Sequence, residues 1–289
     1  MDYVNANANA NANANANANA NANANEEKYY RRHIAFPEIG EDGQSILKSS
    51  KVLVVGAGGI GSPLLTYLAG AGIGEIVIFD FDKIECENLH RQILFNVDDI
   101  GEYKALVAAQ KLKKYNPWIK IISHTERVDE KIIEKIFKVD YVNYFDLIID
   151  CSDNIATRFL IHDNAYKFST NLLTVGIDHL SGSMQLFHFA DLNKRNLGCM
   201  RCLWKDFDYS ILNNNTKDTK IRGILNVVPG IVATMCSLEI IKFLLKQKWK
   251  ERILKQTENL LINLSNFEVN RVHWTKRVDC PLCAQQEFK

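Results

Sequence analysis

Two groups of residues in this 289-residue sequence have types and spacing that suit chemistry: a run of glycines and two pairs of cysteines. The run GAGGIG, from Gly56 to Gly61, fits the pattern GxGxxG. Such glycines permit a tight turn and let backbone N–H groups approach a phosphate at the N-terminus of the next helix. Asp80 follows nineteen positions after Gly61, well placed to bind ribose hydroxyls. We therefore predict a nucleotide site, for ATP or NAD; the alternative is a glycine-rich turn without a ligand.

Four of the seven cysteines form two CxxC pairs, which are Cys199 with Cys202 and Cys280 with Cys283. Four thiolates at this spacing suit one tetrahedral Zn²⁺ with no open position, which is a structural site. A redox dithiol is the alternative, but a thioredoxin-type pair lies at a strand-to-helix turn, and neither pair is predicted there. We interpret the remaining three as core or loop residues: Cys86, Cys151 and Cys236.

Short apolar runs that alternate with helical patterns must position these residues. Buried strands are predicted over Lys51–Val55, Glu75–Asp80, Lys120–Ser123, Asp146–Asp150 and Leu172–Val175. Helices are predicted over Ser62–Ala71, Lys104–Tyr115 and Ala156–Phe168, and a helix or an arm over Tyr29–Ile34. This alternation predicts an α/β fold, a Rossmann-like and mostly parallel sheet with helices on both faces. The C-terminal part is expected to be more antiparallel, and Met184–Phe189, which alternates with period two, to be a more exposed strand.

Composition excludes several classes of protein. Lys and Arg number 35 and Asp and Glu 34, so the net charge of +1 argues against a nucleic-acid-coating protein. The most apolar stretch, Val227–Leu245, contains Pro229, Glu239 and Lys242, so we expect a buried or subunit-facing helix rather than a membrane span. The chain does not open with a basic run followed by an apolar one, and we expect no secretory signal and a cytoplasmic protein.

The N-terminal segment differs in composition from the rest of the chain. Asn and Ala simply alternate from Asn5 to Asn25, and such a sequence buries too little to offset its ordering entropy. We predict a disordered tail over residues 1–25, with an Asn-rich self-association segment as the alternative, and a folded domain over residues 26–289. The polar patch from Asn213 to Asp218 is predicted to be a mobile loop.

The motifs taken together resemble the MoeB/ThiF group, the adenylating enzymes ancestral to ubiquitin-activating enzymes. The resemblance covers about residues 29 to 285 and is carried by the segments RRHIAFPEIGEDGQ, KVLVVGAGGIGS, FDFDKIECENLHRQILF, DIGEYKA, NPWIKI, LIIDCSDNIATR, CMRC, VVPGIVATMCSLEIIKFL and DCPLC. The resemblance implies binding of ATP and Mg²⁺ and adenylation of the C-terminal glycine of a ubiquitin-like sulfur-carrier protein that ends in Gly-Gly. The acyl-adenylate then receives sulfur for molybdopterin, thiamine or thiolated tRNA.

The resemblance also implies site residues. The nucleotide would lie along Gly56, Gly58, Gly59 and Gly61, its ribose held by Asp80. Asn88, Arg91 and Gln92 would reach the phosphates, Lys104 the α-phosphate side, and Asp153 with its neighbour Asn154 the Mg²⁺ side. Arg32 matches an arginine that reaches across from the second subunit of a homodimer. The residues alone also allow other roles. Arg32 and Lys104 could be ordinary surface charges. Asp153 could be a helix N-cap, and Arg91 could pair with a surface carboxylate.

Two departures from the family pattern restrict the expected chemistry. Many relatives carry a cysteine in the loop before the apolar helix, but here the matching position is Thr219, and no cysteine lies between Cys202 and Cys236. We therefore expect adenylation without a covalent protein intermediate at that loop. The sequence contains no rhodanese-like segment after the second CxxC pair, so sulfur is expected from a separate sulfurtransferase or cysteine desulfurase.

Three alternatives to carrier adenylation stay open. The chain could adenylate another substrate, such as a peptide or a tRNA base adduct. It could be a non-catalytic partner subunit of a heterodimeric activating enzyme, although Arg91, Lys104 and Asp153 argue against that reading. A dehydrogenase is a third hypothesis, but it would bind NAD and would not need these three residues.

Overall fold

The computed structural model describes residues 25–141, 143–191, 193, 197–204, 223–249 and 252–284. The chain forms two compact units, Met1–Ile46 and Leu47–Lys289, and each is described by itself. In the first unit, residues 25–34 are helical, as predicted for Tyr29–Ile34, and helix α2 (Gly40–Ser49) begins. Asn25, predicted to end the tail, is the first described residue and is helical; the rest of the predicted tail and the polar patch near Asn213 lie outside the described residues.

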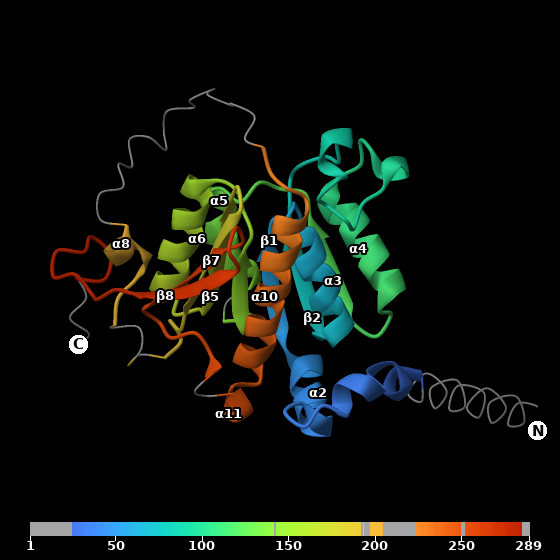
Figure 1. Ribbon diagram of the computed structural model, residues 1–289, viewed down its shortest axis with the longest axis horizontal. Coiled ribbons are helices and arrows are strands. Elements are labelled where there is room, and N and C mark those ends of the chain that lie inside the picture. The colour runs from blue at the N-terminus through green and yellow to red at the C-terminus, as the bar shows by residue number, and fades with distance from the viewer. Residues whose placement is uncertain are drawn as a thin grey trace, which may run out of the picture. The chain divides into compact units, whose positions relative to one another are not determined.

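The second unit is built on one eight-stranded sheet in the order β3-β2-β1-β4-β5-β6-β7-β8 (Figure 1). Its strands are β1 (Lys51–Val55), β2 (Glu75–Phe79), β3 (Lys120–His124), β4 (Leu147–Asp150), β5 (Leu172–Asp178), β6 (Ser181–Phe187), β7 (Glu258–Asn263) and β8 (Glu268–His273). The pairs from β3 to β5 are parallel, and those from β5 to β8 are antiparallel. The predicted mostly parallel sheet with an antiparallel C-terminal part is confirmed.

Helices fill the connections between the parallel strands. They are α3 (Gly61–Ala71), α4 (Lys104–Tyr115), α5 (Glu130–Lys135), which continues as the π-helix η3 (Ile136–Asp140), and α6 (Ile155–Lys167). Two short 3-10 helices, η1 (Cys86–Asn88) and η2 (Val97–Asp99), lie between β2 and α4. The later helices are α8 (Met200–Leu203), α10 (Val227–Leu244) and α11 (Lys246–Trp249). The three predicted helices match α3, α4 and α6 within one residue at each end.

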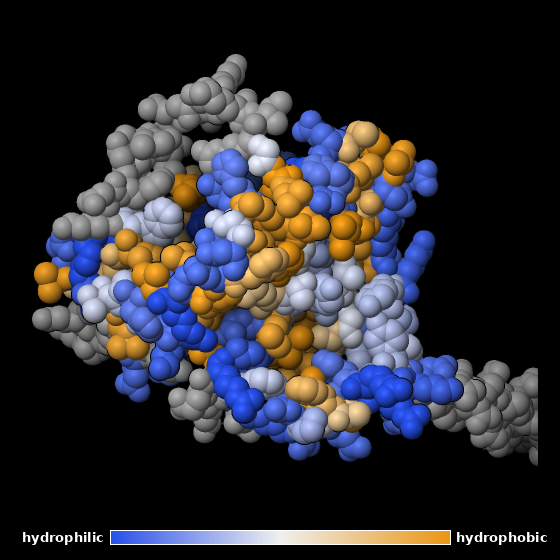
Figure 2. Space-filling view, viewed as in Figure 1, coloured by the Kyte–Doolittle hydropathy of each residue, from blue (hydrophilic) through white to orange (hydrophobic). Residues whose placement is uncertain are grey.

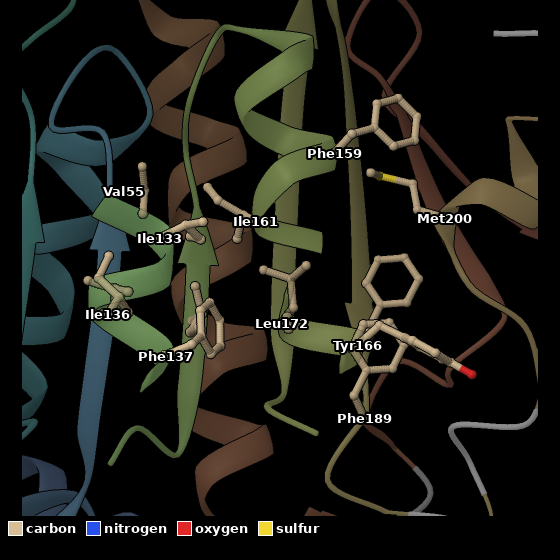
Figure 3. Packing of buried hydrophobic residues seen from close by; sticks show 14 of the residues in the cluster. Val55, Ile133, Ile136, Phe137, Phe159, Ile161, Tyr166, Leu172, Phe189 and Met200 are labelled. Carbon is tan, nitrogen blue, oxygen red and sulfur yellow. The ribbon is translucent and has the colours of Figure 1, made fainter. Parts of the chain in front are cut away.

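The sheet has helices on both faces. Leu53 and Val55 of β1 belong to a cluster with residues of α5, η3 and α6 (Figure 3). Val52 and Val54, which point to the opposite face because side chains alternate along a strand, are also buried. Helix α10 packs against α3 and contacts β5 and β6. The continuous apolar run of β1 is thus explained by burial on both faces.

Helix α10 is the predicted apolar helix, and Figure 2 shows hydrophobic atoms gathered along it. It is long and apolar enough to cross a membrane by length and composition, but 56% of it is buried inside the protein. Buried positions include Val232, Cys236 and Ile240, while Val227, Ile231 and Leu238 are exposed. The helix therefore combines a core-facing side with a partly apolar outer side.

The prediction that Met184–Phe189 is a more exposed strand is wrong. The strand, β6, is mostly buried, because it lies between β5 and β7 and both of its faces are covered. Phe187 belongs to the cluster on the α6 face, and α10 contacts the strand. The polar residues within the predicted segment, Gln185 and His188, are themselves buried.

Candidate nucleotide and metal sites

Three neighbouring parallel strands, β2, β1 and β4, end at the same edge of the sheet. The glycine loop follows β1, Asp80 follows β2, and Asp153 follows β4. The carboxyl edge of an open parallel sheet is where such folds bind ligands. The chain therefore brings the predicted loop and both predicted carboxylates to one edge.

The glycine loop has the tight backbone that the motif predicted. Gly56 has a φ of +95°, and a Cβ there would lie 2.9 Å from the carbonyl oxygen of Cys151. A Cβ at Gly61 would lie 2.0 Å from the carbonyl oxygen of Gly56. Only glycine fits both positions. The backbone turns directly into α3, whose N-cap residue Ile60 supplies no side-chain hydrogen bond, so the helix N-terminus faces the loop without a side-chain cap.

The middle of the loop faces residues from two distant segments. A Cβ at Gly59 would lie 3.5 Å from Cβ of Pro229, at the start of α10, and 3.7 Å from Cδ of Arg91. A Cβ at Gly58 would lie 3.8 Å from Nε2 of Gln92. Arg91 and Gln92, predicted on the phosphate side, therefore lie beside the loop. The start of α10 was not predicted to be there, since no local pattern links Pro229 to the glycines.

Asp80 is held by the backbone. One carboxylate oxygen accepts from the backbone N–H of Ala57 at 2.7 Å, and the other accepts from that of Asp82 at 2.9 Å. Burial raises the pKa of Asp80 above its usual 3.8, and the hydrogen bond from Ala57 and the charge of Lys104 only partly oppose the rise. Each oxygen has a further lone pair, which suits a ribose hydroxyl.

Gln92 and Asn88 form a buried amide pair. Nε2 of Gln92 donates to Oδ1 of Asn88 at 2.7 Å. Oε1 of Gln92 is buried and, within the described part of the chain, accepts no hydrogen bond. Arg91 is half-buried, and its Nη1 donates to the carbonyl oxygen of Glu87 at 2.9 Å. An unsatisfied buried oxygen is costly, and this one lies next to the glycine loop, where a bound molecule or water would satisfy it.

Lys104 is not an ordinary surface charge, because only 5% of it is exposed. It begins α4, and its Nζ donates to Oδ2 of Asp82 at 2.8 Å. Its backbone N–H also donates to the carbonyl oxygen of Asp82, at 2.9 Å. Asp82 was not among the predicted site residues; the available clue was its spacing from Asp80, which ends a predicted strand in the segment FDFD.

Asp153 and Asn154 lie just before α6. The side chain of Asn154 accepts from the backbone N–H of Thr157 at 3.0 Å and is the N-cap of that helix. The alternative role of Asp153 as N-cap is therefore wrong, and the carboxylate of Asp153 is exposed. Carboxylate oxygens are the ligands that Mg²⁺ prefers, so Asp153 fits that predicted use, whereas the side chain of Asn154 is engaged in capping.

A third carboxylate at this edge, that of Asp150, was not predicted as a site residue. It is completely buried and accepts from Nε of Arg158 at 3.0 Å and from Oγ1 of Thr174 at 3.0 Å. The backbone N–H of Ser152 donates to it at 3.0 Å. Arg158 also donates to the carbonyl oxygens of Ser152 and Val175. This network joins β4, β5 and α6, and no local pattern in the sequence predicts it.

Arg32 lies in the helix of residues 25–34, in the first compact unit, and is exposed. Its predicted role, in which it reaches the site of a second subunit, stays a prediction. Thr219, the position predicted to replace a loop cysteine, lies outside the described residues.

The four cysteines of the CxxC pairs come together as predicted. Their sulfur atoms all lie within 4.8 Å of one another and are buried. The separation between Cys199 Sγ and Cys202 Sγ is 3.9 Å, and from Cys199 Sγ to Cys280 Sγ it is 3.6 Å. A tetrahedron with Zn–S bonds of about 2.3 Å has sulfur atoms about 3.8 Å apart. The donor set therefore fits Zn²⁺, with the second pair tied to the first across 81 positions.

The other three cysteines are placed as predicted. Cys151 and Cys236 are buried in the core and Cys86 is exposed. Burial raises the pKa of Cys151 well above its usual value of 9.0. None of the three belongs to the metal-compatible group found among the described residues.

Comparison with known proteins places this geometry in context. The model of the ThiF family matches residues 30–282. The chain is 34% identical over 216 residues to the sulfur carrier protein adenylyltransferase of Thermus thermophilus, covering 75% of this chain and 77% of that protein. It is 33% identical over 257 residues to the SAMP-activating enzyme E1 of Haloferax volcanii, covering 89% and 88%. By contrast, it spans 51% of the adenylyltransferase and sulfurtransferase MOCS3 of Caenorhabditis briggsae.

Solved structures agree with the fold. A crystal structure of Escherichia coli MccB with MccA-N7isoASN matches with a TM-score of 0.71 at 23% sequence identity, over 90% of this chain and 75% of that one. The family match extends over the described sheet, the glycine loop and three of the four CxxC cysteines, and it ends one residue before Cys283. On this evidence the chain belongs to the ThiF family.

Proposed function

We propose that the chain is an ATP-dependent adenylyltransferase that activates the C-terminal glycine of a ubiquitin-like sulfur-carrier protein. The observation that carries the proposal is the single sheet edge at which a glycine loop, Asp80, Arg91 and Lys104 meet in a member of the ThiF family. The named relatives in Thermus and Escherichia coli are sulfur carrier protein adenylyltransferases. The pathway served is molybdopterin, thiamine or tRNA thiolation.

The reaction joins a carboxylate to a phosphate, and both are anions. An oxygen of the carrier's terminal carboxylate attacks the α-phosphorus of ATP, the bond to the β-phosphate oxygen breaks, and pyrophosphate leaves. Little covalent chemistry is required of the protein, so catalysis consists mainly of positioning and charge neutralisation. In the proposal, the backbone N–H groups from Gly56 to Gly61 and the N-terminus of α3 bind phosphate oxygens.

Side chains take the remaining roles. Asp80 accepts from ribose hydroxyls, and Oε1 of Gln92, unsatisfied in the described part of the chain, accepts a hydrogen bond from the bound molecule or its water. Arg91 neutralises phosphate charge, and its planar fork can bind two oxygens at once. The ammonium group of Lys104 either leaves the carboxylate of Asp82 or stays bound to it. In both cases it neutralises the charge that develops at the α-phosphate. Asn88 orients Gln92.

Two metal ions complete the proposed chemistry. Asp153 would hold Mg²⁺, which neutralises phosphate charge when bound. The Cys199, Cys202, Cys280 and Cys283 thiolates would hold Zn²⁺ in a closed structural site. Closely spaced cysteines without disulfides are typical of reducing compartments, and this supports a cytoplasmic enzyme. We further propose that residues 26–289 act as one adenylation module.

A homodimer is proposed from the outer side of α10. Val227, Ile231 and Leu238 are 52%, 37% and 55% exposed on this helix, and Figure 2 shows hydrophobic residues gathered along it. A second copy of the chain would cover these residues and bring its Arg32 to the phosphates. The sulfur donor is proposed to be a separate sulfurtransferase or cysteine desulfurase, and neither nucleic acid nor membrane is a proposed partner.

The decisive experiment is ATP–pyrophosphate exchange with candidate carriers that end in Gly-Gly, followed by the intact mass of the carrier. We expect exchange that depends on the carrier and a mass gain of one AMP. Lys104→Ala and Asp153→Asn should each abolish exchange, and Glu134→Gln, a change at an exposed position of α5, should not. Exchange with a peptide instead of a carrier would establish the alternative substrate class, and exchange with neither would leave the non-catalytic subunit as the better reading.

A further inference from the structure

Helix α6 contacts the first CxxC pair through two adjacent residues, His162 and Asp163. His162 is completely buried, and its ring packs against Phe187 and Phe189 at centroid distances of 5.1 and 5.4 Å. Its Nε2 accepts a hydrogen bond from the backbone N–H of Met200 at 3.0 Å. The imidazole therefore binds the peptide group that follows Cys199.

This hydrogen bond determines which ring nitrogen of His162 carries the proton. Because Nε2 accepts, the neutral ring carries its proton on Nδ1. That nitrogen lies 3.0 Å from Oδ1 of Asp163 and donates to it. The arrangement of backbone amide, imidazole and carboxylate resembles the outer-sphere groups that orient ligands in metal sites.

Asp163 also binds Arg201, the residue after Met200, so the contacts among Met200, His162, Asp163 and Arg201 form a closed ring. Nε of Arg201 donates to its two oxygens at 2.8 and 2.9 Å, and Nη2 of Arg201 donates to Oδ2. Burial alone would raise the pKa of Asp163, but the hydrogen bonds from His162 and Arg201 and the charge of Arg201 lower it overall, so the carboxylate stays charged. Met200 and Arg201 are the two residues between Cys199 and Cys202.

We propose that His162 and Asp163 are positioning residues for the metal site, and that they hold the Met200–Arg201 backbone so that the thiolates of Cys199 and Cys202 point at one cation. The inference rests on the proposed Zn²⁺ site. Packing alone does not require this network, because a buried ion pair is often no more stabilising than apolar residues of the same volume. Figure 3 shows Met200 beside Phe159 of α6, where apolar contact is already available.

The test uses the full-length protein and zinc itself. Bound zinc is counted by elemental mass spectrometry, and its affinity is measured by competition with a chromophoric chelator. Asp163→Asn and His162→Leu should weaken zinc binding about 10- to 100-fold. His162→Gln should lose less, because its amide oxygen can still accept from the N–H of Met200. Asp178→Asn is the matched control, since Asp178 and His179 form the same 3.0 Å contact on the exposed surface.

A second measurement separates positioning from general stability. Melting temperatures of Asp163→Asn and of the unmodified protein are compared with zinc bound and after chelation. Positioning predicts a larger loss in the zinc-bound form, whereas an equal loss in both forms, or wild-type zinc affinity in a folded variant, would overturn the inference. Absence of zinc from the unmodified protein would instead refute the metal site, and with it this inference, while leaving adenylation to be judged by pyrophosphate exchange.

Discussion

Three aspartates at one sheet edge show how environment separates residues of the same type. Asp80 and Asp150 are buried, and each accepts hydrogen bonds from neighbouring backbone or side-chain groups. Asp153 is exposed and caps no helix. The hydrogen bonds of the two buried carboxylates hold the backbone and side chains around them, whereas the exposed carboxylate keeps its oxygens for a cation. This difference supports Asp153 as the proposed Mg²⁺ ligand.

The glycine loop yields a prediction about stability. Gly56→Ala combines an unfavourable φ of +95° with a contact of 2.9 Å to the carbonyl oxygen of Cys151. Gly101 has a similar φ of +91° but open space around it. We expect Gly101→Ala to lose roughly 1 kcal/mol of unfolding free energy and Gly56→Ala roughly 3 kcal/mol. Urea unfolding measures both, and equal losses would mean that the close contact has no effect.

The surroundings of His124 predict that the stability of the fold depends on pH. Its ring stacks on Phe79 at 4.3 Å, and its Nε2 lies 3.1 Å from the hydroxyl of Tyr141. Burial, only partly opposed by Glu126, lowers the pKa of His124 below its usual 6.5. Folding therefore favours the neutral ring. Its stabilisation is complete above about pH 6.5 and is lost as the pH falls from there through the lowered pKa.

His124→Gln keeps an acceptor for Tyr141 but does not titrate. Unfolding free energies measured in urea between pH 8 and pH 5 should fall less steeply for this variant than for the unmodified protein. Identical slopes would show that His124 gains its proton equally in the folded and unfolded chains.

Local patterns revealed some site residues and concealed others. The glycine loop and the CxxC pairs were predictable because their spacing alone encodes a backbone turn and a ligand set. Asp82 and Asp150 were not, because their importance lies in partners on other elements, Lys104 and Arg158. A sequence shows which residues are charged, but burial and pairing are properties of the folded chain.

At the scale of elements, α6 connects the two sites of the molecule. Arg158 near its start binds Asp150 behind the proposed nucleotide site, and His162 and Asp163 in its later turns bind the first CxxC pair. Arg158 also bonds the carbonyl oxygen of Val175 in β5. One helix is thereby tied to two strands and to the cysteines.

Removing the guanidinium of Arg158 should strongly lower the free energy of unfolding. Arg158→Met would leave the completely buried carboxylate of Asp150 without its cation, and breaking a buried pair costs roughly 3–5 kcal/mol of unfolding free energy. Lys138→Met removes one partner of an exposed pair with Glu134 on the surface and should change stability little. Denaturant unfolding measures both variants, and a loss for Arg158→Met no larger than that of the control would contradict the assignment.

The elements differed in how predictable they were. The parallel strands β1 and β2 are continuous apolar runs, and burial on both faces makes such runs plain in a sequence. Strand β8 is exposed along its whole length and therefore has no apolar period to detect. Its existence depends on pairing with β7, which only the folded chain supplies.

For the whole molecule, the proposed dimer predicts that two inactive variants restore each other. If Arg32 acts on the partner's site, an Arg32→Ala subunit and a Lys104→Ala subunit form one intact site in each mixed dimer. Random mixing after dissociation in equal amounts should recover about a quarter of the unmodified exchange activity, since half of the dimers are mixed and each has one of two sites.

Subunit exchange is checked with differently tagged chains, and Leu238→Asp, on the exposed side of α10, should abolish the recovery by preventing association. No recovery from verified mixed dimers would place Arg32 in the site of its own chain, and recovery while light scattering shows only monomers would contradict the proposed dimer.

The distance along the chain between the two CxxC pairs has a consequence for biosynthesis. A ribosome completes Cys202 long before Cys283, with which it pairs at 3.3 Å across 81 positions. A nascent chain thus offers an ion only two thiolates while β7 and β8 are still being made, and two ligands bind far more weakly than four. Binding of the ion by all four cysteines is therefore a late step. It ties the segment after β7 and β8 to the first CxxC pair only after the parallel sheet has had time to form.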